Sequence, residues 1–200
     1  MQYKAVGFDY GGVLAGPPGS GFGKEVSKLL NIDRQRYDEL YFSRYRRLNL
    51  DQITWLDLWK EIIEELGQIE KWPDFLEIDN KYHHNRSPNH EVIELAQKLK
   101  SKGLKVGILS NNSTEMAYKM RKELGDIFEV IHVSAETGYV KPEPAGFRYF
   151  ADALGVSLDE LIFIDDAENS LKTAKGCGFK DILFTSHEQL YNDLKKLRVL

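Results

Sequence analysis

Short apolar runs alternate with amphipathic stretches of helical period from residue 87 to the end of the chain. Such runs, when bounded by polar or glycine positions, are typical of strands buried on both faces of a sheet. A similar run stands near the start of the chain, where Ala5, Val6 and Phe8 precede a carboxylate. The later predicted strands are Lys105–Leu109, Val130–Val133, Leu161–Ile164 and Ile182–Phe184.

Between the predicted strands, apolar residues recur every three or four positions, as on the buried face of a helix. Ser87 and Pro88 are predicted to start the first of these helices, as N-cap and first helical residue, and Gly103 to end it. Because strands and helices alternate, we expect a parallel sheet with right-handed crossovers. The other predicted helices end near Leu124, span Phe147–Leu154 and Asn169–Ala174, and start at Ser186, which forms a cap with Gln189.

The segment from about Phe22 to Tyr82 has a helical pattern throughout and no strand pattern. Thr54 and Asp57 have the spacing of a capping box, which predicts that a helix begins there and runs to Leu66. We interpret its apolar side chains as core packing. They are Trp55, Leu58, Trp59, Ile62, Ile63 and Leu66.

The stretch from Ala15 to Gly21 is a loop by its glycine and proline content. It marks the point where the chain leaves the sheet-forming part and enters the helical segment. We therefore predict an α/β protein in which residues 1–14 and 87–200 form one unit and residues 15–86 form an inserted helical unit.

Composition and charge narrow the classes of function. The chain has 200 residues, of which 42% are hydrophobic and 29% charged, as in ordinary globular proteins. The net charge of −4 argues against binding to nucleic acid or to a membrane surface through bulk positive charge. No apolar stretch approaches the roughly 20 residues that span a bilayer, and no signal-peptide pattern is present, so we expect a cytoplasmic protein. Cys177 is the only cysteine, which leaves no intrachain disulfide.

Polar groups follow the predicted strands or the loops after them, and parallel strands bring such groups to one edge of the sheet. A carboxylate, a hydroxyl with an amide, an ammonium and two further carboxylates suit a site for phosphate and Mg²⁺, which prefers oxygen ligands. In this interpretation Asp9 attacks phosphorus, Asp9 and Asp166 hold Mg²⁺, and Ser110 and Lys141 hold the phosphoryl oxygens. The groups are Asp9, Ser110 with Asn111, Lys141, and Asp165 with Asp166.

Four segments together resemble the haloacid dehalogenase-like hydrolase superfamily: Phe8–Leu14, Ile108–Asn111, Gly138–Pro144 and Phe163–Asp166. The subgroup that the chain resembles includes the phosphatase domain of soluble epoxide hydrolases and bacterial sugar-phosphate phosphatases. The resemblance implies a three-layer Rossmann-like core, with a helical cap formed by residues 15–86.

The resemblance also implies a role for each site residue. Asp9 would be the nucleophile. Ser110 and Lys141 would join it as catalytic residues that bind the phosphate, and Asn111 would also bind the substrate. Asp166 and the main-chain carbonyl of Gly11 would join Asp9 as ligands of Mg²⁺. Asp165 would contact the metal indirectly, through water or another ligand.

The chain departs from the family pattern at two positions. The phosphatases usually carry a second Asp two residues after the nucleophile, which protonates the leaving group, but this chain has Gly11 there. Such assistance is worth roughly 10²–10⁴-fold, so we expect slow turnover of substrates with poor leaving groups. Asn169 also stands one residue closer to Asp166 than in the usual spacing, so its role is left open.

The leading hypothesis is a Mg²⁺-dependent phosphatase of small phosphorylated metabolites with good leaving groups, such as sugar 1-phosphates or acyl phosphates. The alternative suggested by Gly11 is a protein that binds a phosphorylated ligand or a partner with little turnover. A 2-haloacid dehalogenase is less favoured, because Tyr10 and Gly12 do not fit that branch's motif and the pair Asp165-Asp166 favours a metal.

Some charged residues outside these motifs have two interpretations. Arg44, Arg46 and Arg47 could bind an anionic group of a substrate, but a solvated helix face is favoured. His83 and His84 could supply the missing acid, although an exposed linker pair is favoured. Both a monomer and a dimer are compatible with the sequence.

Overall fold

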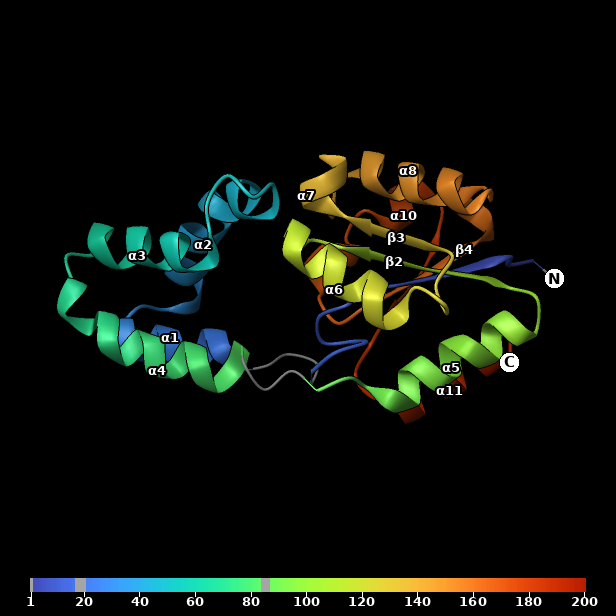
Figure 1. Cartoon of the computed structure of the whole chain (residues 1–200), viewed down its shortest axis with the longest axis horizontal. Coiled ribbons are helices and arrows are strands. Elements are labelled where there is room, and N and C mark those ends of the chain that lie inside the picture. Colours follow the sequence, from blue (N-terminus) through green and yellow to red (C-terminus); the bar gives the residue numbers. More distant parts are fainter. Residues whose placement is uncertain (1, 17–20, 84–86) are drawn as a thin grey trace. The chain divides into compact units, whose positions relative to one another are not determined.

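The computed structural model describes residues 2–16, 21–83 and 87–200. The chain forms two compact units (Figure 1). We call Met1–Gly19 with Ser87–Leu200 the core unit, and Ser20–Arg86 the inserted unit. Among the described residues, no helix combines the length and the apolar character needed to cross a membrane.

The core unit contains a five-stranded sheet in the order β3-β2-β1-β4-β5, and every neighbouring pair of strands is parallel. The central strand β1 therefore has β2 on one side and β4 on the other, which confirms the predicted parallel α/β fold. The second and fourth strands each run one residue further than predicted, and the last strand starts two residues earlier and ends one residue earlier than predicted. The strands are β1 (Ala5–Phe8), β2 (Lys105–Ser110), β3 (Val130–Val133), β4 (Leu161–Asp165) and β5 (Lys180–Leu183).

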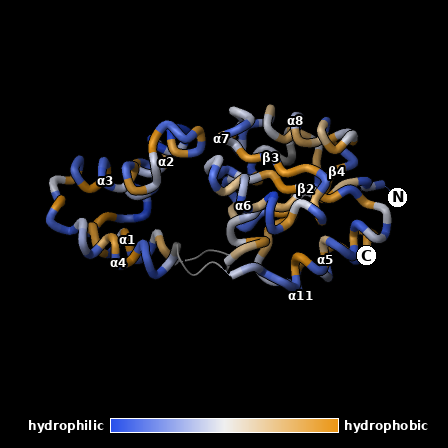
Figure 2. Tube along the Cα trace, viewed as in Figure 1, coloured by the Kyte–Doolittle hydropathy of each residue, from blue (hydrophilic) through white to orange (hydrophobic). Residues whose placement is uncertain are grey.

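Helices cover both faces of this sheet, giving three layers (Figure 1). One face packs against α5 (His90–Ser101), α6 (Thr114–Leu124) and α11 (His187–Lys196). The other face packs mainly against α8 (Pro144–Leu154). Figure 2 shows the central part of the sheet, around β2 and β3, as strongly hydrophobic, and every residue of β1 and β4 is buried. The shorter helices are α7 (Ser134–Thr137), η2 (Leu158–Glu160), α9 (Glu168–Leu171) and α10 (Ala174–Cys177).

Two glycines on neighbouring strands make room for an aromatic ring of α8. Gly7 of β1 and Gly107 of β2 are paired in the sheet. A Cβ atom at Gly7 would lie 2.5 Å from Cε1 of Phe150, and one at Gly107 would lie 2.8 Å from Cζ of the same ring. The missing side chains therefore allow α8 to pack closely on the centre of the sheet.

The inserted unit consists of helices with their own hydrophobic core. Phe22, Trp59 and Phe75 are fully or almost fully buried in it, in mutual ring contact. The predicted capping box is confirmed, because Thr54 and Asp57 each accept a hydrogen bond from the other's main-chain N–H. The elements are α1 (Phe22–Leu30), α2 (Arg34–Asn49), α3 (Trp55–Glu65), η1 (Ile69–Lys71) and α4 (Trp72–His83).

The predicted start of the first helix after the insertion is wrong. α5 begins at His90, after Asn89. Residues 87–89 pair instead with residues 14–16: the N–H of Gly16 donates to the carbonyl of Ser87, and the N–H of Asn89 donates to that of Leu14. These bonds hold the return of the chain in an extended form.

Two other predicted helices differ from the structure. The helix predicted over Asn169–Ala174 is two single turns, α9 and α10, with Lys172 and Thr173 between them. The helix predicted from Phe147 begins earlier, at Pro144. Proline suits a first helical position, because its ring presets φ and the N–H that it lacks would have no partner within the helix.

Candidate functional site

The central strand and its neighbours bring polar residues to the carboxyl edge of the sheet. Asp9 directly follows β1, and its N–H donates to the carbonyl of Ile164 in β4 at 2.8 Å. Ser110 is the last residue of β2 and is buried, and Asp165 is the last residue of β4. The parallel order of these strands therefore places all three residues at the same edge.

Lys141 reaches this edge from the loop between α7 and α8. Its Nζ lies 2.9 Å from Oδ1 of Asp9 and 2.5 Å from Oδ2 of Asp165, and its side chain is 2% exposed. Burial opposes the charge of Lys141, but the attraction of Asp165 and Asp9 outweighs burial and raises the lysine pKa. The ammonium is thus held as a cation between two carboxylates.

Asp165 is committed to protein partners. Oδ2 accepts from Lys141, and Oδ1 accepts from the N–H of Ala167 at 2.9 Å. Burial raises its pKa to about 6, and the neighbouring Lys141 limits that rise. Both oxygens of the Asp165 carboxylate thus accept hydrogen bonds from the protein, and the shorter of the two comes from Lys141.

Asp166 lies against the main chain of the loop after β1. Gly12 has φ +78°, and a Cβ atom there would lie 2.1 Å from Oδ2 of Asp166. A residue with a side chain would therefore displace this carboxylate. The consecutive glycines Gly11 and Gly12 indicate that another group approaches the backbone closely. The local sequence pattern does not identify that group as Asp166.

The acidic groups have a donor set that fits a hard divalent cation. Asp9, Asp165 and Asp166 each offer a carboxylate oxygen, and these oxygens lie within 4.8 Å of one another. Carboxylate oxygens are the ligands that Mg²⁺ takes in proteins. Lys141 contacts two of these three carboxylates, since Asp165 accepts from it and Oδ1 of Asp9 lies 2.9 Å from its Nζ.

Asn111 uses its side chain on the loop that carries Lys141. Its Nδ2 donates to the carbonyl of Lys141, and its Oδ1 accepts from the N–H of Lys141, both at 2.8 Å. These reciprocal bonds join the end of β2 to residue 141, which is 30 positions later. The structure thus places Asn111 beside the site, with its amide directed at the backbone of Lys141.

Gly11 is half-buried and forms a bridge with Ala15. It carries no side chain to donate a proton. His84, one candidate replacement, lies outside the described residues, and nothing is described of the side chain of His83.

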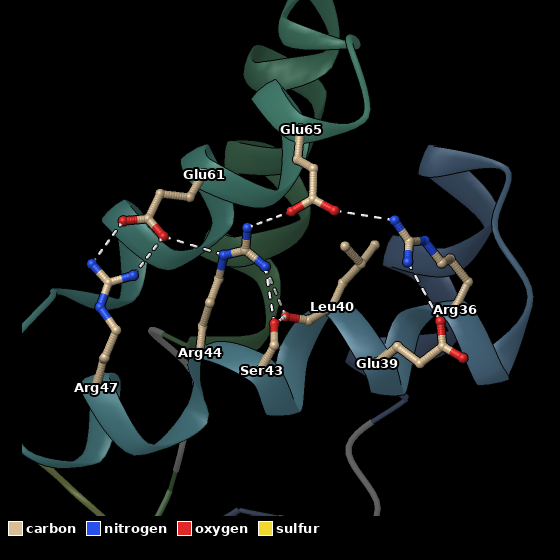
Figure 3. A pocket seen from close by; sticks show the side chains of 8 residues that line it. All are labelled: Arg36, Glu39, Leu40, Ser43, Arg44, Arg47, Glu61 and Glu65. Atoms are coloured by element: carbon tan, nitrogen blue, oxygen red, sulfur yellow. Dashed lines mark hydrogen bonds and ion pairs between the residues drawn. The ribbon is translucent and has the colours of Figure 1, made fainter.

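The inserted unit contains a charged cavity of about 470 Å³ between α2 and α3 (Figure 3). Arg and Glu side chains alternate along it in the order Arg47, Glu61, Arg44, Glu65, Arg36, with Glu39 last (Figure 3). The solvated face expected here is wrong for Arg44, whose side chain is 15% exposed and lies between the two carboxylates of α3.

These ion pairs also affect the acidic partners. The pKa of Glu61 is lowered mainly by its hydrogen bond from Arg47, and that of Glu65 mainly by its hydrogen bond from Arg44. In the described part of the chain, the guanidinium groups lining this cavity are therefore paired with carboxylates.

Comparison with known proteins relates this arrangement to one family. A family model for haloacid dehalogenase-like hydrolases matches residues 3–178. The chain aligns over 216 positions with bifunctional epoxide hydrolase 2 of Rattus norvegicus at 25% identity, and this match covers 98% of the chain and 39% of the relative. It is 32% identical over 90 residues to a phosphatase of Mycobacterium tuberculosis, covering 44% of the chain and 42% of that protein. The chain thus spans about two fifths of the length of these curated relatives.

Solved structures share the fold. A predicted HAD-like family hydrolase from Porphyromonas gingivalis superposes with a TM-score of 0.67 at 16% identity, covering 99% of this chain and 98% of that one. A HAD family enzyme from Bacteroides thetaiotaomicron, in complex with magnesium and inorganic phosphate, has a TM-score of 0.59 at 22% identity, with 90% and 93% covered.

Proposed function

The chain belongs to the haloacid dehalogenase-like hydrolases, and we propose that it is a Mg²⁺-dependent phosphatase of small phosphorylated metabolites that acts through Asp9. The observation that supports this most is the position of Lys141, whose Nζ lies 2.9 Å from Asp9 in a cluster that also contains Asp165 and Asp166. A carboxylate nucleophile beside a fixed cation and a metal-binding group is the set of residues that phosphoryl transfer needs.

In the proposed reaction a carboxylate oxygen of Asp9 forms a bond to phosphorus as the bond to the leaving oxygen breaks. Ser110 and Lys141 bind the phosphoryl oxygens and orient them for this attack. Asp9, Asp166 and the carbonyl of Gly11 would hold Mg²⁺, which when bound supplies positive charge that stabilises the phosphoryl oxygens. Water then hydrolyses the aspartyl-phosphate and releases inorganic phosphate.

The absence of a side chain at Gly11 bears on the choice of substrate. The leaving oxygen has no carboxylic acid at this position from which to take a proton, so solvent or the substrate itself must supply it. Leaving groups that depart without protonation are less affected. We therefore propose sugar 1-phosphates or acyl phosphates as the preferred class, ahead of simple alkyl phosphates.

We propose that residues 15–86 act as the cap of the core unit. The inserted unit is a separate compact body with its own aromatic core, and it enters the chain between β1 and β2. Its helices would then carry the residues that select the substrate.

The test is phosphate release from a panel of sugar 1-phosphates, acyl phosphates, alkyl phosphates and p-nitrophenyl phosphate, with Mg²⁺ and with a chelator. Asp9→Asn is measured in parallel, and circular dichroism checks that the variant is folded. Release that requires both Mg²⁺ and Asp9 supports the proposal. Release that is equal in the variant contradicts the role of Asp9.

A second candidate is a protein that binds a phosphorylated ligand or a partner and turns over little. The observation that favours it is again Gly11, which leaves the site without its usual proton donor. Such a protein would gain thermal stability from inorganic phosphate with Mg²⁺ but release no phosphate above the Asp9→Asn background. A 2-haloacid dehalogenase is less favoured, because the Asp165-Asp166 pair suits a metal site; halide release from a 2-haloacid would identify that activity.

A further inference from the structure

The loop that carries Lys141 is held by side chains from two other parts of the core unit. On its N-terminal side, Asn111 exchanges two hydrogen bonds with the backbone of Lys141, each at 2.8 Å. On its C-terminal side, the hydroxyl of Thr173 donates to the carbonyl of Pro142 at 2.8 Å. The backbone on both sides of the Lys141 side chain is therefore fixed.

Thr173 stands between α9 and α10, 31 residues after Pro142. The segment that contains it starts from β4, whose last residue, Asp165, binds the ammonium of Lys141 and also accepts from Ala167. The stretch from Asp165 to Thr173 thus contacts both the ammonium of Lys141 and the backbone carbonyl of the following residue, Pro142.

We propose that Asn111 and Thr173 form a two-point clamp that positions the ammonium of Lys141 for binding a phosphoryl group. The proposal rests on the proposed function. It assigns Asn111 to the lysine backbone as a positioning residue, and it adds Thr173, which no motif identifies.

A clamp has a physical purpose at this residue. A lysine side chain has four rotatable bonds, so a small shift of its backbone is passed on to the ammonium. Misplacing a binding group by about 1 Å can cost on the order of 10²-fold in rate. Asp9 and Asp165 contact only the ammonium of Lys141 in these ion pairs. The hydrogen bonds of the clamp instead contact the backbone of residues 141 and 142.

Thr173→Val is the informative variant, because valine keeps the shape of the side chain and removes only the hydroxyl. We expect KM and the inhibition constant for inorganic phosphate to rise about tenfold, a change close to one lost hydrogen bond, while kcat falls less. Thr173→Ser keeps the hydroxyl and should restore both constants. Thr185→Val removes a hydroxyl that donates to Gln189 and serves as the matched control.

A second measurement needs no turnover. Hydrogen exchange of the main-chain N–H of Lys141, followed by mass spectrometry of the peptide spanning residues 138–144, reports directly on the clamp. Exchange should be about tenfold faster in Thr173→Val and Asn111→Asp, since one bond of the clamp is lost in each, and unchanged in Thr185→Val.

The outcomes separate the clamp from the proposed function. If the wild-type protein releases no phosphate from the panel, the proposed function fails, and hydrogen exchange together with binding of inorganic phosphate decides on the clamp alone. Wild-type exchange and phosphate affinity in Thr173→Val would overturn the clamp. A loss that Thr173→Ser does not restore, or that follows a matching drop in melting temperature, would assign Thr173 to stability and would also overturn it.

Discussion

Lys141 and Asp165 form an ion pair that is shut away from solvent, with Nζ 2.5 Å from Oδ2 and side chains 2% and 1% exposed. Taking both charges out of water is costly, and their attraction offsets this only if the remaining hydrogen-bonding groups are satisfied. Here Ala167 donates to the second oxygen of Asp165, and Asp9 accepts a further contact from Lys141. Removing either residue of the pair would therefore leave the other as a buried charge without its partner.

Asp165→Asn should destabilise the core unit by about 3 kcal/mol, because the buried ammonium of Lys141 then loses the nearer of its two carboxylate partners. The measurement is urea unfolding followed by far-UV circular dichroism. Adding Lys141→Met to Asp165→Asn should recover part of the loss, since no buried ammonium remains. Additive losses in the double variant would show that the two residues are not energetically coupled.

Gly12→Ala should weaken Mg²⁺ binding about 10- to 100-fold, the usual cost of disturbing a metal ligand, because the new Cβ would lie 2.1 Å from Oδ2 of Asp166. Isothermal titration with Mg²⁺ measures it. Gly103→Ala is the control: Gly103 also has a positive φ, +88°, but a Cβ atom there meets nothing within 4 Å. Equal Mg²⁺ affinity in both variants would remove Asp166 from the metal site.

Gly107→Ala should destabilise the core unit by about 1–3 kcal/mol through overpacking against Phe150. The double variant Gly107→Ala with Phe150→Leu should lose less than the sum of the single variants, because the smaller side chain frees space for the methyl group. Urea unfolding of the four proteins, including the wild type, measures this coupling. A simple sum would mean that the strain lies elsewhere.

The inserted unit should lose stability as the pH falls below about 4.5. The pKa of Glu65 is lowered, chiefly by its hydrogen bond from Arg44, so its contribution is present above the ordinary value of 4.5 and is lost as the pH falls through the lowered pKa. The chain's three tryptophans are Trp55, Trp59 and Trp72, so their fluorescence reports on this unit alone.

Two variants test the source of that acid sensitivity. Glu65→Gln should flatten the dependence of the urea midpoint on pH between 7 and 3. Glu64→Gln, at a neighbouring exposed position of the same helix that does not line the cavity, should not. If the urea midpoint of Glu65→Gln falls with pH as steeply as that of the wild-type protein, the ion pairs of Glu65 with Arg44 and Arg36 are not the cause of the acid sensitivity.

The positions of the site residues could be predicted because they follow from a local pattern. An apolar run that ends on a polar residue predicts both a buried strand and a group at its carboxyl end, as at Asp9, Ser110 and Asp165. Parallel strands then bring these groups together whatever lies between them in sequence. What they bind stays a proposal, because the pattern places side chains and does not show a ligand.

Other features depend on pairing between distant segments, and no local pattern contains them. Ser87 and Pro88 have the residue types of a helix start, but the backbone of this stretch pairs with residues 14–16. Likewise, the partner of Gly12 is Asp166, and the partner of Thr173 is Pro142. A threonine in a turn between two short helices has no sequence signal that would identify such a contact.

The place of β1 in the sheet has a consequence for how the protein forms during synthesis. β1 leaves the ribosome before the other strands of the sheet, yet Ala5 pairs with Lys105 and Leu161, which follow about a hundred and about a hundred and fifty residues later. The inserted unit is continuous in sequence, so all of its own contacts are available while β1 still waits for its neighbours. Nascent chains that stop before β4 therefore lack both Asp165 and Asp166, and the acidic cluster forms only late in translation.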